Sequence, residues 1–241
     1  MPADPLAGDP RLPEHFGAAW PAVEGFHDLL RDQGLLRGLV GPRELARLWE
    51  RHLVNSAAVV PFLPATGTIV DVGSGAGLPG IVVAAMRPDA QIVLLEPMER
   101  RTDWLSEVVE TLGLRNVRVL RGRAEDQVGE LSADAVTARA VAALDKLYGW
   151  TLPLLAVGGR LVALKGGRAQ QEAEEAVMVG ERLGGGVAEI RVAPTLPGLE
   201  PTSVVLVTRT NAGTVPERAR VSRGTEGRSR RPRRSTKGRG A

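Results

Sequence analysis

Four glycines and two acidic residues stand at spacings that are typical of a cofactor-binding loop. The stretch TIVDVGSGAGLPGI, from Thr68 to Ile81, joins an apolar run that ends in Asp71 to a segment with helical character. Glycine lets a backbone approach a ligand closely, and a helix N-terminus offers unpaired N–H groups. The stretch therefore predicts a nucleotide-like cofactor lying across the turn, with a tight turn that binds nothing as the alternative. Its glycines are Gly73, Gly75, Gly77 and Gly80.

Two cofactors fit this loop. The segment GAGLPG matches the dinucleotide pattern G-x-G-x-x-G, and Glu96 follows Gly75 by 96 − 75 = 21 residues, near the spacing of about 20 for a ribose-binding acid. An NAD-dependent oxidoreductase has these features. A methyltransferase that uses S-adenosylmethionine has them too, because its cofactor also carries ribose hydroxyls. Asp71 favours the methyltransferase, since a carboxylate there attracts a sulfonium cofactor and repels a pyrophosphate.

The surrounding segments predict a doubly wound, mostly parallel sheet. Short apolar runs alternate with helical segments, as in βα units that cover both faces of a sheet. The last two strands are joined by PTLPGLEP, which contains no helix, and they should form an antiparallel hairpin at an edge. Strands are expected over 68–73, 91–96, 116–120, 134–139, 159–166, 187–193 and 202–208, and helices over 78–86, 99–113, 144–157 and 170–184.

Four regions are expected along the chain. They are a flexible leader at 1–13, a helical extension at 14–65, the sheet domain at 66–212 and a disordered basic tail at 213–241. A helix that begins near Pro42 and stops before Pro61 carries His52 on its apolar stripe, which favours a core histidine with a satisfied hydrogen bond. Arg47 and Arg51 lie on the opposite face, where they could reach an anion or water.

Composition restricts the remaining possibilities. The 241 residues include no cysteine and three histidines without metal-ligand spacing, so neither a disulfide nor a metal site is expected. No apolar run reaches the roughly 18 residues of a membrane span, and the N-terminus lacks a signal sequence, which favours the cytoplasm. Residues 217–241 have a net charge of 10 − 2 = +8, so the rest carries 3 − 8 = −5. The basic tail either contacts RNA non-specifically or aids solubility.

Several motifs in order resemble one family closely. They are LWERHLVNSAAV, DVGSGAGLPGI, LLEPMERRTDWL, RGRAED, AVTARAVAALDKL and GGRLVALKGG. Together they resemble the GidB family, ribosomal small-subunit methyltransferase G, over roughly residues 14–210. The resemblance implies a class I S-adenosylmethionine-dependent methyltransferase fold, Rossmann-like, with residues 66–212 as the methyltransferase domain. It also implies methyl transfer to N7 of a guanine near the decoding site of small-subunit RNA, guanine 527 of 16S rRNA.

The resemblance further implies roles for individual residues. Arg139 would close the site beside the cofactor or the incoming base. Lys165 holds the equivalent place after the fifth strand and is either a second substrate-side residue or a surface lysine. The other cofactor residues would be Asp71 and the loop Gly73, Gly75, Gly77 and Leu78 at the methionine end, Glu96 at the ribose, and Ala124 and Glu125 beside the adenine.

The implied reaction asks little of side chains. Guanine N7 has a free lone pair and no proton to lose, so no general base is needed and no catalytic residue is assigned. Alignment of N7, the methyl carbon and the sulfur in one line should supply most of the rate. The expected partner of the monomeric enzyme is 16S rRNA or a small-subunit particle. An NAD-dependent oxidoreductase and a small-molecule methyltransferase of the same fold remain the alternatives.

Overall fold

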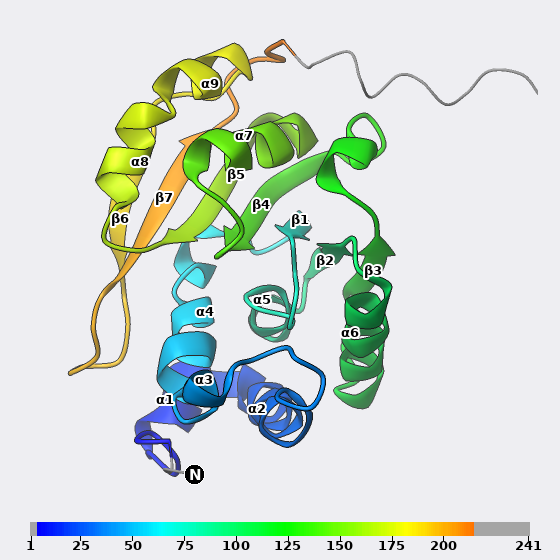
Figure 1. Cartoon of the computed structure of the whole chain (residues 1–241), viewed down its shortest axis with the longest axis vertical. Helices are drawn as coiled ribbons and strands as arrows, with labels where there is room; N and C mark the ends of the chain where they lie inside the picture. The colour runs from blue at the N-terminus through cyan, green and yellow to red at the C-terminus, as the bar shows by residue number, and fades with distance from the viewer. Residues whose placement is uncertain (1–3, 215–241) are drawn as a thin grey trace, which may run out of the picture.

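A seven-stranded sheet runs through the chain in the order β3-β2-β1-β4-β5-β7-β6. The computed structural model describes residues 4–214 (Figure 1). Strands β1 to β5 are parallel, whereas β7 lies antiparallel between β5 and β6. The predicted doubly wound sheet and its C-terminal antiparallel hairpin are therefore confirmed. The strands are β1 (Gly67–Val72), β2 (Ala90–Glu96), β3 (Val117–Arg121), β4 (Ala133–Arg139), β5 (Leu155–Lys165), β6 (Glu189–Ala193) and β7 (Thr202–Thr208).

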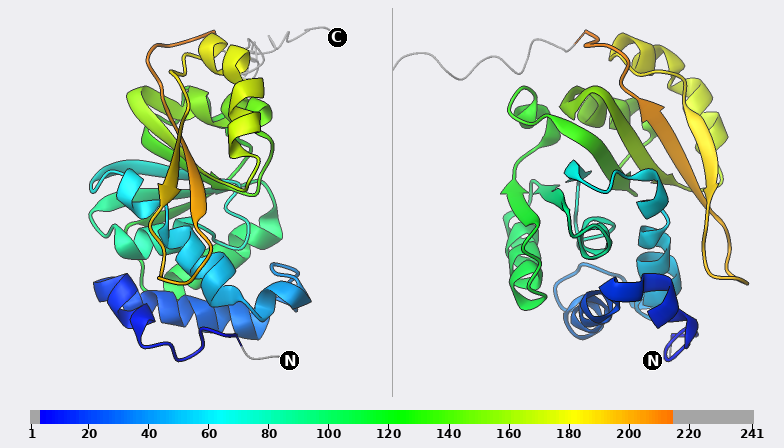
Figure 2. Two further views of the ribbon diagram at one scale, coloured as in Figure 1. Left: turned by 90° about the vertical axis from the view of Figure 1, so that its left-hand side faces the viewer. Right: turned by 180° about the vertical axis from the view of Figure 1, so that it is seen from behind.

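Helices cover both faces of the sheet and enclose two apolar cores (Figures 1 and 2). Ile69 and Val70 are neighbours on β1 but belong to different cores, as the alternation of side chains along a strand requires. One core includes side chains from α2 (Trp20–Gln33), α5 (Gly80–Met86) and α6 (Glu99–Thr111), and the other includes side chains from α7 (Leu144–Thr151) and α8 (Ala169–Glu175). In the described part of the chain, no helix is long and apolar enough to cross a membrane.

The N-terminal residues pack onto the protein. Leu6 and Leu12 are buried, and α1 (Arg11–Phe16) begins inside the segment expected to be a flexible leader. The carboxylate of Asp4 accepts a hydrogen bond from the backbone N–H of Trp49 at 2.9 Å. The prediction of a flexible leader is therefore wrong for residues 4–13. The proline content of the segment suggested flexibility, but its two leucines bury apolar surface against the rest of the protein. Residues 1–3, and residues 215–241 of the predicted tail, lie outside the described residues.

Three predicted helices differ in extent from the observed ones. The helix expected from Pro42 to Pro61 is divided into α3 (Pro42–Leu45), a π-helical segment η2 (Trp49–Val54), α4 (Asn55–Ala57) and η3 (Val60–Phe62). The helix expected over 144–157 ends early, because Pro153 sits in a short 3-10 turn and β5 already starts at Leu155. The helix expected over 170–184 is split at Ala176 into α8 and α9 (Val177–Arg182).

Candidate active site

The loop after β1 is a tight turn fixed to its neighbours. The N–H of Gly73 donates to the carbonyl of Leu95 at 2.8 Å, and the hydroxyl of Ser74 donates to the carbonyl of Asp71 at 2.9 Å. Gly73 has φ +71°, and a Cβ there would lie 3.0 Å from a methyl carbon of Val141. Only glycine combines this backbone conformation with so close an approach between the loops after β1 and β4.

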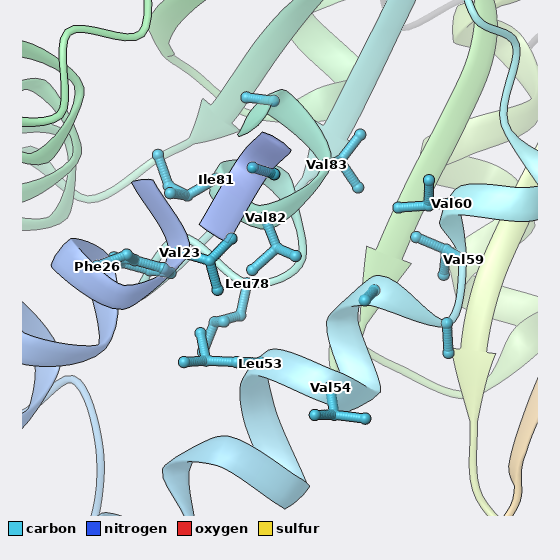
Figure 3. Close-up of a cluster of buried hydrophobic side chains, with 14 of the residues drawn as sticks. Val23, Phe26, Leu53, Val54, Val59, Val60, Leu78, Ile81, Val82 and Val83 are labelled. Carbon is cyan, nitrogen blue, oxygen red and sulfur yellow. The ribbon is translucent and has the colours of Figure 1, made fainter. Parts of the chain in front are cut away.

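Two of the glycines serve the core rather than a ligand. A Cβ on Gly77 would lie 2.8 Å from Ile81 and 3.1 Å from Phe26, and a Cβ on Gly80 would overlap Leu94. Leu78 is also buried, and Figure 3 shows it among core side chains of the N-terminal helices and α5. The hypothesis that every glycine makes room for a cofactor is therefore wrong for Gly77 and Gly80.

We expect Gly80→Ala to destabilise the fold by about 1–3 kcal/mol, because the new methyl group overpacks the space between α5 and β2. Gly149→Ala is the matched control. Gly149 lies in α7, and a Cβ added to it would meet nothing within 4 Å, so alanine should stabilise the protein by up to about 1 kcal/mol. Urea unfolding of both variants measures the two changes. Equal stabilities would contradict the close packing described at Gly80.

A pocket of about 330 Å³ opens at the carboxyl ends of β1, β2 and β4. In a doubly wound sheet this is the edge where ligands bind. The lining residues are Val72, Gly73, Leu95, Glu96, Pro97, Met98, Arg101, Gly122, Arg123, Ala124, Glu125, Arg139, Ala140, Val141 and Trp150. Five predicted site residues thus meet in one place: Gly73, Glu96, Ala124, Glu125 and Arg139. The other four predicted cofactor residues, Asp71, Gly75, Gly77 and Leu78, lie outside this lining.

Glu96 is the buried acid of the pocket. Its side chain is 2% exposed, and its two oxygens accept hydrogen bonds from the N–H groups of Gly75 and Met98, each at 3.0 Å. Arg101 approaches one of these oxygens at 3.8 Å. Each carboxylate oxygen has a second acceptor site, so Glu96 can bind two hydroxyl groups without losing its backbone contacts. Gly75 therefore supports the pocket through Glu96.

Two apolar pocket residues were missed from the sequence. Met98 follows Glu96 by two positions and is 40% exposed, which is unusual for a large apolar side chain in this chain. Trp150 comes from the last turn of α7. Both line the same pocket as Ala124, so a flat heterocycle would find apolar surface there. The position of Met98 just after the strand-ending acid was a usable signal, whereas Trp150 reaches the pocket only through the fold.

Asp71 lies beneath the loop. The residue is 1% exposed, and its Oδ2 accepts a hydrogen bond from the N–H of Gly80 at 3.1 Å. Burial raises the pKa of Asp71 to about 7, against the lowering effect of its hydrogen bond from the N–H of Gly80. Its Oδ1 is buried and has no hydrogen-bond partner within residues 4–214. An oxygen of this kind fits a site that receives a cationic group.

Arg139 is held by the N-terminal helices. Its guanidinium donates to Nδ1 of His52 at 2.9 Å and to the carbonyl of Arg51 at 3.1 Å. His52 Nε2 lies 2.8 Å from a carboxylate oxygen of Glu44. Burial, followed by the charge of Arg139, lowers the pKa of His52 to about 4, so the imidazole is neutral near pH 7. The predicted buried histidine with a satisfied hydrogen bond is confirmed, and its partner is a pocket residue.

The two arginines beside His52 make ion pairs. Arg47 contacts Glu50 at 2.7 Å, and Arg51 contacts Glu44 at 3.3 Å. The sequence left open whether these side chains reach an anion or only water, and both find carboxylates of the same N-terminal segment.

Comparison with known proteins decides the family. A family model described as rRNA small subunit methyltransferase G matches residues 20–190, which is more than half of the chain. The chain belongs to the GidB family. A curated relative from Salinispora arenicola, named ribosomal RNA small subunit methyltransferase G, is 48% identical over 220 residues, covering 88% of this chain and 91% of its own. A relative of the same name from Thermobifida fusca is 58% identical over 163 residues, covering 68% of this chain and 69% of its own.

Solved structures agree with the fold. A SAM-dependent O-methyltransferase from Thermotoga maritima superposes with a TM-score of 0.51 at 17% identity, covering 76% of this chain and 71% of its own. NSun6 from Pyrococcus horikoshii gives a TM-score of 0.52 at 14% identity, covering 67% of this chain and 52% of its own. The predicted class I methyltransferase fold is thus confirmed. Membership of the GidB family confirms the predicted enzyme class, an S-adenosylmethionine-dependent rRNA methyltransferase.

A second hollow of about 490 Å³ adjoins the first in this GidB-family enzyme, and both are lined by Arg139, Ala140 and Val141. Lys165 lines the second hollow with its side chain only 10% exposed. It donates to the carbonyl of Ala142 and to Glu172, the latter at 2.8 Å. The interpretation of Lys165 as a surface lysine is therefore wrong, because both contacts hold its ammonium group at the wall of the hollow.

Proposed function

We propose that this chain transfers the methyl group of S-adenosylmethionine to N7 of a guanine in small-subunit ribosomal RNA, guanine 527 of 16S rRNA. The observation that carries the cofactor half of the proposal is Glu96. This buried carboxylate is fixed by two backbone N–H groups at the wall of a pocket, with acceptor sites left for a pair of hydroxyls. Adjacent ribose hydroxyls match that arrangement. Membership of the GidB family supports the RNA half.

The remaining pocket residues suit the other parts of the cofactor. Met98, Trp150 and Ala124 offer apolar surface to the adenine, with Glu125 at the rim. The unpartnered oxygen of Asp71 suits the cofactor's ammonium group, which would reach it directly or through water. When bound there, S-adenosylmethionine supplies an electrophilic methyl group on a sulfonium leaving group.

The chain itself positions the reactants. Guanine N7 carries its own lone pair, so the reaction removes no proton and needs no general base. His52 is unsuited to such a role, because its Nδ1 already accepts from Arg139. The two hollows share Arg139, Ala140 and Val141 in their walls, which supports a cofactor in one hollow and a nucleotide in the other. Holding the reacting atoms about 3–3.5 Å apart and in line is then the main source of rate.

The same proposal covers the setting of the reaction. A monomer acts in the cytoplasm on 16S rRNA or on a small-subunit particle, and the basic segment 217–241 adds non-specific contacts to RNA. A small-molecule methyltransferase of the same fold is the competing function, because the geometry of the pocket alone suits both. Membership of the GidB family favours the RNA substrate.

Transfer of labelled methyl from S-adenosylmethionine tests the proposal. Small-subunit particles and deproteinised rRNA from cells lacking the enzyme are the two acceptors, and the products are digested to nucleosides. We expect label in 7-methylguanosine at a single site in at least one acceptor. Label in a different nucleoside, or no label despite intact cofactor binding, would contradict the proposed substrate. Activity on a small-molecule fraction that survives ribonuclease would favour the competing function.

A further inference from the structure

We propose that Glu44 and His52 are positioning residues that hold the guanidinium of Arg139 at the junction of the two hollows, ready for an anionic oxygen of a bound reactant. The inference rests on the proposed function for the identity of the reactants. It assigns a role in the reaction to the N-terminal helices, which precede β1 in sequence.

Arg139 is anchored by neutral acceptors. It takes part in none of the ion pairs found between side chains of residues 4–214, and its two hydrogen bonds go to an imidazole nitrogen and a backbone carbonyl. These contacts use two of the five N–H groups of a guanidinium, which leaves 5 − 2 = 3 for a ligand. The positive charge is therefore fixed in place without being neutralised by a contacting carboxylate.

Glu44 fixes the orientation of His52. A neutral imidazole has one donor and one acceptor nitrogen. Because Arg139 can only donate, Nδ1 of His52 must be the acceptor, and Nε2 must carry the hydrogen and donate to Glu44 at 2.8 Å. The carboxylate thereby selects the tautomer that Arg139 requires, as an outer carboxylate orients a ligand histidine in metal sites.

The location of Glu44, His52 and Arg139 allows an anionic group of a reactant to reach the guanidinium. His52 lies in the π-helical segment η2, and such segments often occur at functional sites. Arg139 ends β4, 87 residues away in sequence, and lines both hollows. Two anionic groups could meet it there, the carboxylate of S-adenosylmethionine or a phosphate of the RNA. Both present the same chemistry, an oxygen anion that accepts from a planar guanidinium.

Two amide substitutions separate positioning from packing. In His52→Asn the amide oxygen can take the place of Nδ1 and accept from Arg139, whereas the contact with Glu44 is lost. In His52→Gln the longer side chain places its amide near Nε2, which keeps a donor for Glu44 and leaves Arg139 without that acceptor. Both variants bury a polar amide at the same position, so a purely structural role predicts similar effects.

The readouts are kcat and KM for methyl transfer to the small-subunit particle, the Kd of S-adenosylhomocysteine and the melting temperature. We expect His52→Gln to reduce kcat/KM at least tenfold more than His52→Asn, at similar melting temperatures, since a hydrogen bond to a charged group is worth a tenfold effect or more. Glu44→Gln, which keeps an acceptor for Nε2–H, should resemble the unmodified chain more closely than Glu44→Ala.

The anion is identified by which parameter changes. A weaker Kd for S-adenosylhomocysteine in His52→Gln assigns Arg139 to the cofactor carboxylate, and an unchanged Kd with a raised KM for the particle assigns it to an RNA phosphate. Equal kcat/KM values for the two amide variants would overturn the proposal, as would losses that follow the melting temperature. Absence of transfer by the unmodified chain is a separate result, which would count against the proposed function.

Discussion

Replacing Glu96 with alanine is expected to weaken the binding of S-adenosylmethionine at least a hundredfold. The substitution removes the proposed partner of the ribose hydroxyls and also releases the N–H groups of Gly75 and Met98, which shape the pocket. Each of these contacts is a hydrogen bond to a charged group, with a typical net value of about 1.5–3 kcal/mol. The loss of two such contacts to the cofactor alone corresponds to the expected factor.

Titration calorimetry with S-adenosylmethionine measures this effect. Glu99→Ala is the matched control, because Glu99 begins α6 three residues after Glu96 but contacts Arg121 and is 68% exposed. Its removal should leave cofactor affinity unchanged. Glu96→Gln is a second probe, since one amide group cannot accept from both Gly75 and Met98. Wild-type affinity in Glu96→Ala would move the cofactor away from this pocket.

Asp71→Asn is expected to stabilise the protein and weaken its cofactor binding. Burial raises the pKa of Asp71 from 3.8 in the unfolded chain to about 7 in the folded chain. The contribution of this group to stability is therefore full below pH 3.8, declines as the pH rises toward 7, and is lost above that value. The three-unit difference corresponds to a cost on the order of 4 kcal/mol at pH 8.

Asparagine removes this cost, because it resembles the protonated acid at every pH. Its amide N–H group replaces an oxygen that has no partner within residues 4–214, so a buried donor is left without an acceptor. This loss lowers the expected stabilisation by about 1–3 kcal/mol. We therefore expect a net stabilisation of about 1–3 kcal/mol at pH 8 that shrinks toward pH 5. The neutral amide should also reduce the gain in the free energy of unfolding that S-adenosylmethionine causes. Chemical unfolding at the two pH values, with and without the cofactor, provides both readouts.

Failure of either part is informative. A stability difference that does not change between pH 5 and pH 8 would mean that Asp71 has an ordinary pKa in the folded chain. An unchanged response to the cofactor would remove Asp71 from the binding site. Asp126→Asn is a suitable control, because Asp126 lies in the exposed turn after β3 and should change neither quantity.

The sequence predicted those parts of the site that local pattern determines. Glu96 was predicted as a site residue because it ends a strand and follows Gly75 at the sequence spacing typical of a ribose-binding acid. The strand and helix alternation likewise predicted a doubly wound, mostly parallel sheet and the final antiparallel hairpin. The glycine motif was less informative. A sequence motif does not show that a Cβ at Gly77 or Gly80 would point into the core.

Long-range contacts account for what was missed. His52 was recognised as buried from its helical stripe, but its bond to Arg139 joins residues 87 positions apart. Trp150 reaches the pocket from a helix whose sequence suggests only a core-facing stripe. The prediction of a flexible leader was wrong for a similar reason, because the burial of Leu6 and Leu12 depends on surfaces that other segments provide.

The position of β7 determines when the sheet can be completed during synthesis of the chain. The strand synthesised last in the sheet lies between β5 and β6, and β6 pairs with no other strand of the described sheet. While the chain emerges from a ribosome, β5 therefore presents an open edge until residues 202–208 arrive, and an open edge invites pairing with other chains. Chains broken off before β7 should be insoluble. An enzyme of ribosomal RNA thus completes its own sheet only after its last strand has been synthesised.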